Sequence, residues 1–138
     1  MLLTIEKVVI LKSINIFSET AEEWLVEVAS ILAEVQVQAG ETIFEKGDVG
    51  RSMYIIIDGK VRVHDEDRTI AELGERDIFG ELAILDPEPR VASVTAIEDT
   101  RLFRIDQHAL YELMAEHVEV AYGIIRVLCR RLRDKVRG

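Results

Sequence analysis

The placement of glycine is the feature that most restricts how this chain can fold. Six of its eight glycines fall between positions 40 and 80, and apolar residues alternate with polar ones between them. A period of two is typical of strands with one buried face, and glycine marks tight corners between strands. The sequence therefore predicts a small, sharply turned sheet in the middle of the chain.

Several short strands are expected from this pattern. They lie at Val35 and Val37, at Ile43, at 54–57, at Val61 and Val63, at 70–73, at 92–96 and at 102–105. Asp58-Gly59 is a strong two-residue hairpin signal between the strand at 54–57 and the strand that follows it. Short strands joined by glycine turns predict a β-barrel or jelly roll.

Helical patterns occur on both sides of the predicted sheet. Thr20 with Glu23 forms a capping-box pattern ahead of apolar residues at helical spacing, and Asp106 is a good N-cap for a following helix. A length of 138 residues and an apolar content of 49% suit one domain with one core. The expected fold class is α+β: an antiparallel β-roll at 34–105, with an N-terminal helical segment at 1–33 and two C-terminal helices at 106–138.

The last helix, expected from Val118 onward, carries an apolar seam at alternating spacings of four and three. Its members are Val118, Tyr122, Ile125, Cys129, Leu132 and Val136. This spacing is typical of two packed helices, so the seam predicts packing on the barrel, a homodimer contact or an exposed moving element. Gly123 interrupts the helix at a cost of about 1 kcal/mol relative to Ala and marks a bend.

Residues 79–94, with the sequence FGELAILDPEPRVASV, combine the groups that a sugar-phosphate ligand needs. Gly80 opens a turn into a short helix whose first amides favour an anion, and Arg90 can grip two phosphate oxygens at once. Glu81 offers acceptors suited to a ribose hydroxyl. These groups together suggest a nucleotide, whereas Glu81 and Arg90 taken alone would more often be a structural salt bridge.

At these residues the sequence resembles the phosphate-binding cassette of the cyclic nucleotide-binding domain family. The similarity extends upstream through Gly40, Gly47 and Gly50 and through 53–63. The resemblance implies that Arg90 holds the cyclic phosphate and Glu81 the ribose 2′-hydroxyl, with backbone amides completing the cradle. The implied ligand-binding set is Phe79, Gly80, Glu81, Leu82, Ala83, Arg90, Val91 and Ala92.

Two positions depart from the family pattern. Arg51 stands where relatives commonly carry an acidic or amide residue, so a contact that supports the arginine is expected to be missing or remade. Val91 stands where relatives that favour cGMP often have Thr, and valine cannot donate a hydrogen bond to guanine. If the ligand is a cyclic purine nucleotide, the sequence therefore favours cAMP over cGMP.

The resemblance also implies an output. In this family the C-terminal helix typically swings toward the bound base, so Ile124, Val127, Leu128 and Arg131 are the expected lid, free to move if the seam packs elsewhere. The protein would then be a regulatory sensor acting on an effector protein that the sequence does not identify. A degenerate cassette, which keeps the fold and acts through protein contacts without a ligand, is the alternative.

Other classes of function find less support. Six cations against one carboxylate give the last 13 residues a net charge of +5, within a chain of net charge −9, but cations also suit a helix C-terminus. A nucleic-acid role is not favoured, since too few residues follow this helix for a DNA-reading domain. His64 is the one histidine between positions 34 and 105 and is expected in an exposed acidic turn, so no clustered ligands predict a metal, and no catalytic motif predicts an enzyme. With a single cysteine, Cys129, no secretory signal and no membrane span, a cytoplasmic protein is expected.

Overall fold

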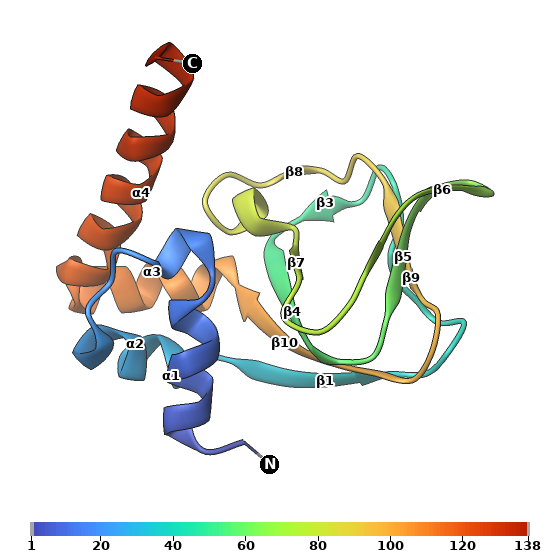
Figure 1. The fold of residues 1–138 in the computed structure, drawn as a ribbon, viewed down its shortest axis with the longest axis horizontal. Helices are drawn as coiled ribbons and strands as arrows, with labels where there is room; N and C mark the ends of the chain where they lie inside the picture. The colour runs from blue at the N-terminus through green and yellow to red at the C-terminus, as the bar shows by residue number, and fades with distance from the viewer. Residues whose placement is uncertain (1, 138) are drawn as a thin grey trace. The chain divides into compact units, whose positions relative to one another are not determined.

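The computed structural model describes residues 2–137, which divide into two compact units. We call residues 32–107 the β unit and residues 2–31 with 108–137 the helical unit. Figure 1 shows the elements of each unit.

The β unit contains two four-stranded antiparallel sheets and one two-stranded sheet, with strand orders β1-β10-β4-β7, β2-β9-β5-β6 and β3-β8. The strands are β1 (Ala33–Val37), β2 (Thr42–Phe44), β3 (Val49–Gly50), β4 (Ser52–Asp58), β5 (Val61–Asp65), β6 (Arg68–Leu73), β7 (Ile78–Phe79), β8 (Glu88–Pro89), β9 (Ser93–Ala96) and β10 (Thr100–Asp106). A 3₁₀ helix, η2 (Glu81–Ile84), follows β7. The predicted β-roll is confirmed. The two-residue strands β3, β7 and β8 escaped prediction because they are too short to show alternation.

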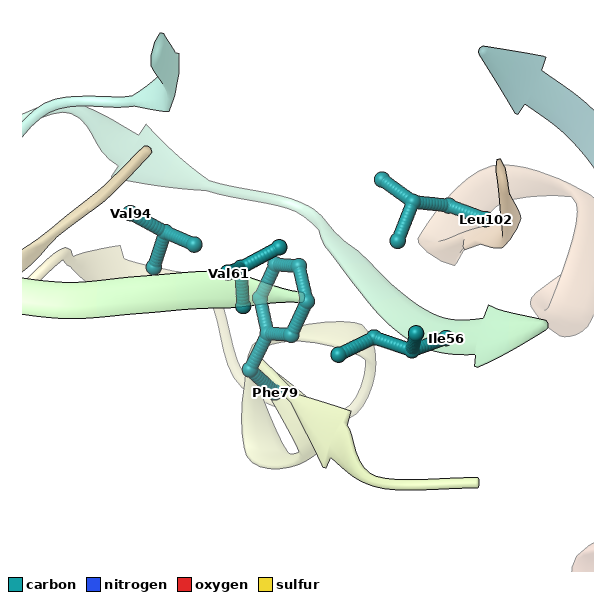
Figure 2. Close-up of a cluster of buried hydrophobic side chains, with 5 residues drawn as sticks. All are labelled: Ile56, Val61, Phe79, Val94 and Leu102. Carbon is teal, nitrogen blue, oxygen red and sulfur yellow. The ribbon is translucent and has the colours of Figure 1, made fainter. Parts of the chain in front are cut away.

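The core of the β unit lies between its two larger sheets. Ile56, Phe79 and Leu102 come from one sheet, and Val61 and Val94 come from the other (Figure 2). All five side chains are at most 8% exposed. This contact between the inner faces explains why strands of alternating polarity fold into a roll, since each sheet buries its apolar face against the other.

The predicted hairpin at Asp58-Gly59 is wrong. β4 and β5, the strands on either side, belong to different sheets, so this turn carries the chain from one sheet to the other. Gly59 has a φ of 105°, and a Cβ there would lie 2.7 Å from the Thr100 Cα. The absence of a side chain at Gly59 thus allows the backbone here to lie close to the backbone at Thr100. A two-residue hairpin occurs one strand later, where Glu66 and Asp67 join β5 to β6 and Asp65 pairs with Arg68.

The helical unit contains α1 (Thr4–Lys12), the 3₁₀ helix η1 (Asn15–Phe17), α2 (Glu22–Ala29), α3 (Gln107–Glu116) and α4 (Val118–Arg137). The predicted capping box is also wrong. Ala21 is the N-cap of α2, without a side-chain cap, and Thr20 is only 1% exposed. Its Oγ1 has no hydrogen-bond partner among the described residues, because this side chain is buried against Gly123 of α4. Helix α3 begins directly after Asp106, as predicted.

Helix α4 buries the face opposite to the predicted seam. Its buried residues are Val120, Gly123, Ile124 and Val127, whereas the apolar seam residues Val118, Tyr122, Ile125, Leu132 and Val136 are 45% to 87% exposed. The lid face is expected to be free only if the seam packs elsewhere, and in this structure that condition is not met, because the seam is exposed and Ile124 and Val127 are buried. Within the helical unit, Arg131 donates to Asn15 Oδ1, and Thr20 packs against Gly123.

Gly123 is thus explained by close packing and not by a bend, and its replacement tests this. A Cβ at position 123 would collide with Thr20 Oγ1 and lie 3.3 Å from the Thr20 Cα. Gly123→Ala should lower the midpoint of thermal unfolding, because overpacking costs about 1–3 kcal/mol and the gain in helix propensity is only about 1 kcal/mol.

The double variant Thr20→Ala/Gly123→Ala supplies the control. It removes both the colliding atom and a buried hydroxyl without a partner, so it should be more stable than Gly123→Ala alone. A Gly123→Ala protein that melts at or above the wild-type temperature would contradict this explanation.

Candidate functional site

A cavity of about 250 Å³ opens in the β unit beside η2. All eight residues of the predicted ligand-binding set line it: Phe79, Gly80, Glu81, Leu82, Ala83, Arg90, Val91 and Ala92. It also includes Phe44, Val63, Asp86, Glu88, Pro89 and Val94, which the sequence reasoning did not single out as ligand-binding residues. Its volume is slightly below the usual range of small-molecule pockets, about 300–1,000 Å³, which suits a compact ligand.

The backbone around Arg90 is fixed by the short sheet of β3 and β8. Val49 pairs with Pro89 and Gly50 with Glu88 in this sheet. The Arg90 amide donates to the Asp48 carbonyl at 2.6 Å, and the Gly47 amide donates to the Arg90 carbonyl at 2.8 Å. A loop with two prolines is thus tied to the glycine-rich turn at 47–50, which sets the direction in which the Arg90 side chain leaves the backbone.

The guanidinium of Arg90 lies in a slot formed by two glycines. A Cβ on Gly50 would be 2.7 Å from Arg90 Nη1, and a Cβ on Gly80 would be 2.6 Å from the same atom. Arg90 Nη2 donates to the Ser52 carbonyl at 2.8 Å, and its Cζ lies 4.0 Å from the centroid of the Phe44 ring. Any residue other than glycine at these two positions would push the guanidinium out of this slot.

Burial lowers the pKa of Arg90, while nearby Tyr54 and Asp48 act to raise it. Burial raises the pKa of the Tyr54 hydroxyl, because in both groups it disfavours the charged form. Within residues 2–137 Arg90 forms no ion pair with a carboxylate, so the alternative of a structural Glu81–Arg90 salt bridge finds no support. A guanidinium remains protonated under all ordinary conditions, so this is a partly desolvated cation facing a cavity. Such a group favours an anionic ligand.

Gly80 produces the turn that places Glu81, Leu82 and Ala83 along the cavity. Its φ of 75° and ψ of 20° lie in the left-handed region, and it is the N-cap of η2. The Ala83 amide already donates to the Gly80 carbonyl at 3.2 Å inside this turn. Glu81 and Ala83 are half-buried, and Leu82 and Val91 are 56% and 85% exposed at the cavity.

The guanidinium of Arg90 is supported by a backbone group and not by the side chain of residue 51. Arg51 itself is exposed, and its carbonyl accepts from the Gln107 amide. The contact to the guanidinium comes from the Ser52 carbonyl, the backbone group of the next residue. A side-chain pattern could not have revealed Ser52, since a backbone oxygen has no sequence signature.

The predicted lid residues do not line this cavity. Ile124, Val127, Leu128 and Arg131 belong to the helical unit, where the first two are buried and the other two are half-buried. His64 is also placed differently from expectation. It lies within strand β5, is half-buried, and its ring nitrogens contact the Glu66 carbonyl at 2.7 Å and Thr95 Oγ1 at 2.8 Å.

Two kinds of feature are absent from residues 2–137. No group of three or more His, Cys, Asp or Glu side chains is placed to hold a metal ion there. No described helix combines the length and the apolar character needed to cross a membrane.

Comparison with known proteins agrees with the geometry of the cavity. A CRP-like cAMP-activated global transcriptional regulator of Mycobacterium tuberculosis is 35% identical over 129 residues, which is 90% of this chain and 58% of that protein. A cyclic AMP receptor protein of Thermus thermophilus is 37% identical over 69% of this chain and 46% of its own length. The chain thus spans about half the length of these two relatives.

A solved structure resembles nearly the whole chain. The N-terminal domain of a transcriptional regulator from Streptomyces coelicolor superposes with a TM-score of 0.85 at 30% identity, covering 93% of each chain. The model of the cyclic nucleotide-binding domain matches residues 34–117, which include the whole cavity. The chain therefore belongs to the cyclic nucleotide-binding domain family and is a regulatory domain of that family, similar to those of cAMP receptor proteins.

Proposed function

We propose that the cavity beside η2 binds cAMP and that Arg90 is its phosphate ligand. The observation that carries this proposal is the guanidinium itself: half-buried, held by a backbone carbonyl and a ring face, and without a carboxylate partner in the described chain. A cyclic phosphate carries one negative charge and two exposed oxygens. It would replace the water lost by the guanidinium with charge-assisted hydrogen bonds.

Glu81 is proposed to accept a hydrogen bond from the ribose 2′-hydroxyl. It follows the left-handed Gly80 directly, so the turn points the first residues of η2 along the cavity. The long 3.2 Å bond from the Ala83 amide leaves that amide able to share its hydrogen with a phosphate oxygen. Phosphate and ribose would then be held by different groups, Arg90 with the Ala83 amide and Glu81, which fixes the orientation of the nucleotide.

The preference for cAMP over cGMP rests on Val91 and on the relatives. Val91 lines the cavity and is 85% exposed, so its side chain is available to a base, but it offers no hydrogen-bond donor. The Mycobacterium relative is described as cAMP-activated and the Thermus relative as a cyclic AMP receptor.

The regulatory response is proposed to run through α4 and to reach an effector protein. In this structure the proposed lid face is held inside the helical unit, by the contact of Arg131 with Asn15 and by burial of Ile124 and Val127. A ligand can shift this helix only if it binds better to one of its positions than to another. The response therefore requires these contacts to loosen or tighten on binding.

A second candidate function is a scaffold of the same fold that acts without a ligand. The observation in its favour is the exposed apolar seam of α4, a surface that a second copy of the chain could cover in a homodimer. Titration of the wild-type protein with cAMP and cGMP separates the two functions, since the scaffold would bind neither.

Removal of the guanidinium tests the site. Arg90→Ala should weaken cAMP binding in isothermal titration calorimetry by about 1.5–3 kcal/mol or more, the range for hydrogen bonds to charged groups. Arg62→Ala is the matched control, because Arg62 also lies in the β unit and donates only to Thr69 Oγ1 there. It should bind cAMP as the wild type does.

Glu81→Ala extends the same experiment to the ribose. This variant should lose affinity for cAMP and should discriminate less between cAMP and 2′-deoxy-cAMP than the wild type does. If folded Arg90→Ala and Glu81→Ala proteins both bind cAMP normally, the nucleotide does not occupy this cavity.

The identity of residue 91 should influence the choice of base. Val91→Thr adds a hydroxyl at the cavity and should shift the affinity ratio toward cGMP by about 1 kcal/mol, the net value of one hydrogen bond. Val91→Ala is the control, since it changes size without adding a donor. A wild type that already prefers cGMP would show that another residue reads the base.

Hydrogen exchange tests the role of α4. Saturating cAMP should slow amide exchange along 118–137 in the wild type, because binding favours one position of this helix. Arg90→Ala, measured at the same cAMP concentration, should show no such change. If cAMP slows amide exchange at 79–92 but leaves the exchange rates in α4 unchanged, the response does not run through α4.

A further inference from the structure

A second cavity, of about 370 Å³, lies on the surface of the helical unit. It is lined by Glu19, Ile125, Arg126, Cys129, Arg130 and Arg133, and we call it the arginine pocket. Its three arginines come from α4 at spacings of four and three residues. These spacings place their side chains along one face of the helix.

The charges in the arginine pocket do not balance. Arg130 Nη1 lies 2.7 Å from Glu19 Oε2, and its Nη2 donates to Ser18 Oγ at 3.2 Å. Arg126 and Arg133 are exposed, and neither forms a hydrogen bond or an ion pair within residues 2–137. Three cations thus face a single carboxylate.

This imbalance stands out in an acidic chain. The protein carries 26 acidic residues against 17 lysines and arginines, and three cations of the β unit, Lys46, Arg101 and Arg104, form ion pairs with carboxylates. Arg101, for example, is 2.6 Å from Asp58 and 3.5 Å from Glu34, and Lys46 is 3.0 Å from Asp65. Like charges four residues apart destabilise a helix, so an anion placed among these arginines would relieve repulsion as well as form new bonds.

We propose that the arginine pocket binds a small ligand that carries a diphosphate group. Guanidinium groups match phosphate oxygens in geometry and charge. Arg126 and Arg133 are seven residues apart, which is roughly 10 Å along a helix axis, and two linked phosphates bridge that span better than one. The Ile125 and Cys129 side chains also line the pocket and give it an apolar part between the arginines.

Calorimetric titration of the full chain with inorganic pyrophosphate tests this proposal. The wild type should bind pyrophosphate roughly tenfold or more tightly than inorganic phosphate, because two charge-assisted contacts replace one. Arg126→Gln/Arg133→Gln should lose this binding. Arg62→Gln/Arg68→Gln removes the same charge from the β unit and should still bind pyrophosphate. This control distinguishes binding at the arginine pocket from non-specific attraction between pyrophosphate and positive charge.

Two further variants sharpen the assignment. Arg90→Ala should bind pyrophosphate as the wild type does, so the result is independent of the cavity proposed for cAMP. Glu19→Gln should bind it more tightly, because the carboxylate that now competes for Arg130 is gone. A merely structural role of Glu19 would instead weaken binding.

The outcomes that would overturn the proposal are distinct. They are a wild type that fails to bind millimolar pyrophosphate, equal losses in both double variants while circular dichroism shows both folded, or a loss caused by Arg90→Ala alone. Binding of duplex DNA or of vesicles with anionic lipid, without binding of pyrophosphate, would likewise reject a small-ligand site in favour of a macromolecular surface.

Discussion

The position of one guanidinium organises the functional end of the β unit. Arg90 can occupy its slot only because Gly50 and Gly80 lack side chains, and because the Ser52 carbonyl accepts its hydrogen bond. Gly50 is the last residue of β3, Ser52 is the first residue of β4, and Gly80 follows β7. The slot therefore exists only once strands distant in sequence have paired, so the site depends on the whole roll.

Phe79 links this slot to the core. Its ring belongs to the buried cluster with Ile56 and Leu102, lines the cavity, and stacks on Tyr54 at a centroid distance of 5.0 Å. Phe44 lies 5.8 Å from the same ring and also supports the guanidinium. Aromatic pairs of this kind contribute about 0.5–1.5 kcal/mol beyond burial, so these contacts stabilise the wall behind Arg90. A wall that is already ordered reduces the ordering cost of binding a ligand.

Alternation and glycine turns predicted the longer strands, and the resemblance of residues 79–94 to a family cassette supplied eight of the residues that line the cavity, because both kinds of pattern lie within short stretches of sequence. They failed where distant segments meet. Gly59 resembles a hairpin glycine but makes room for Thr100, and Thr20 resembles a helix cap but is buried against Gly123. Both contacts join residues far apart in sequence. The Ser52 carbonyl and the imbalance in the arginine pocket were likewise visible only in three dimensions.

The two faces of α4 explain why its seam misled the sequence reasoning about the lid. Both faces are apolar at helical spacing, and only tertiary packing decides which is buried. The buried face includes Ile124 and Val127, each at most 3% exposed, and burial of such side chains contributes about 1.5–3 kcal/mol apiece. The partly exposed pair of Arg130 with Glu19 contributes about 1 kcal/mol or less. Apolar packing therefore sets the energy that any ligand-driven movement of α4 must overcome. A ligand with a smaller difference in affinity between two helix positions would leave α4 where it is.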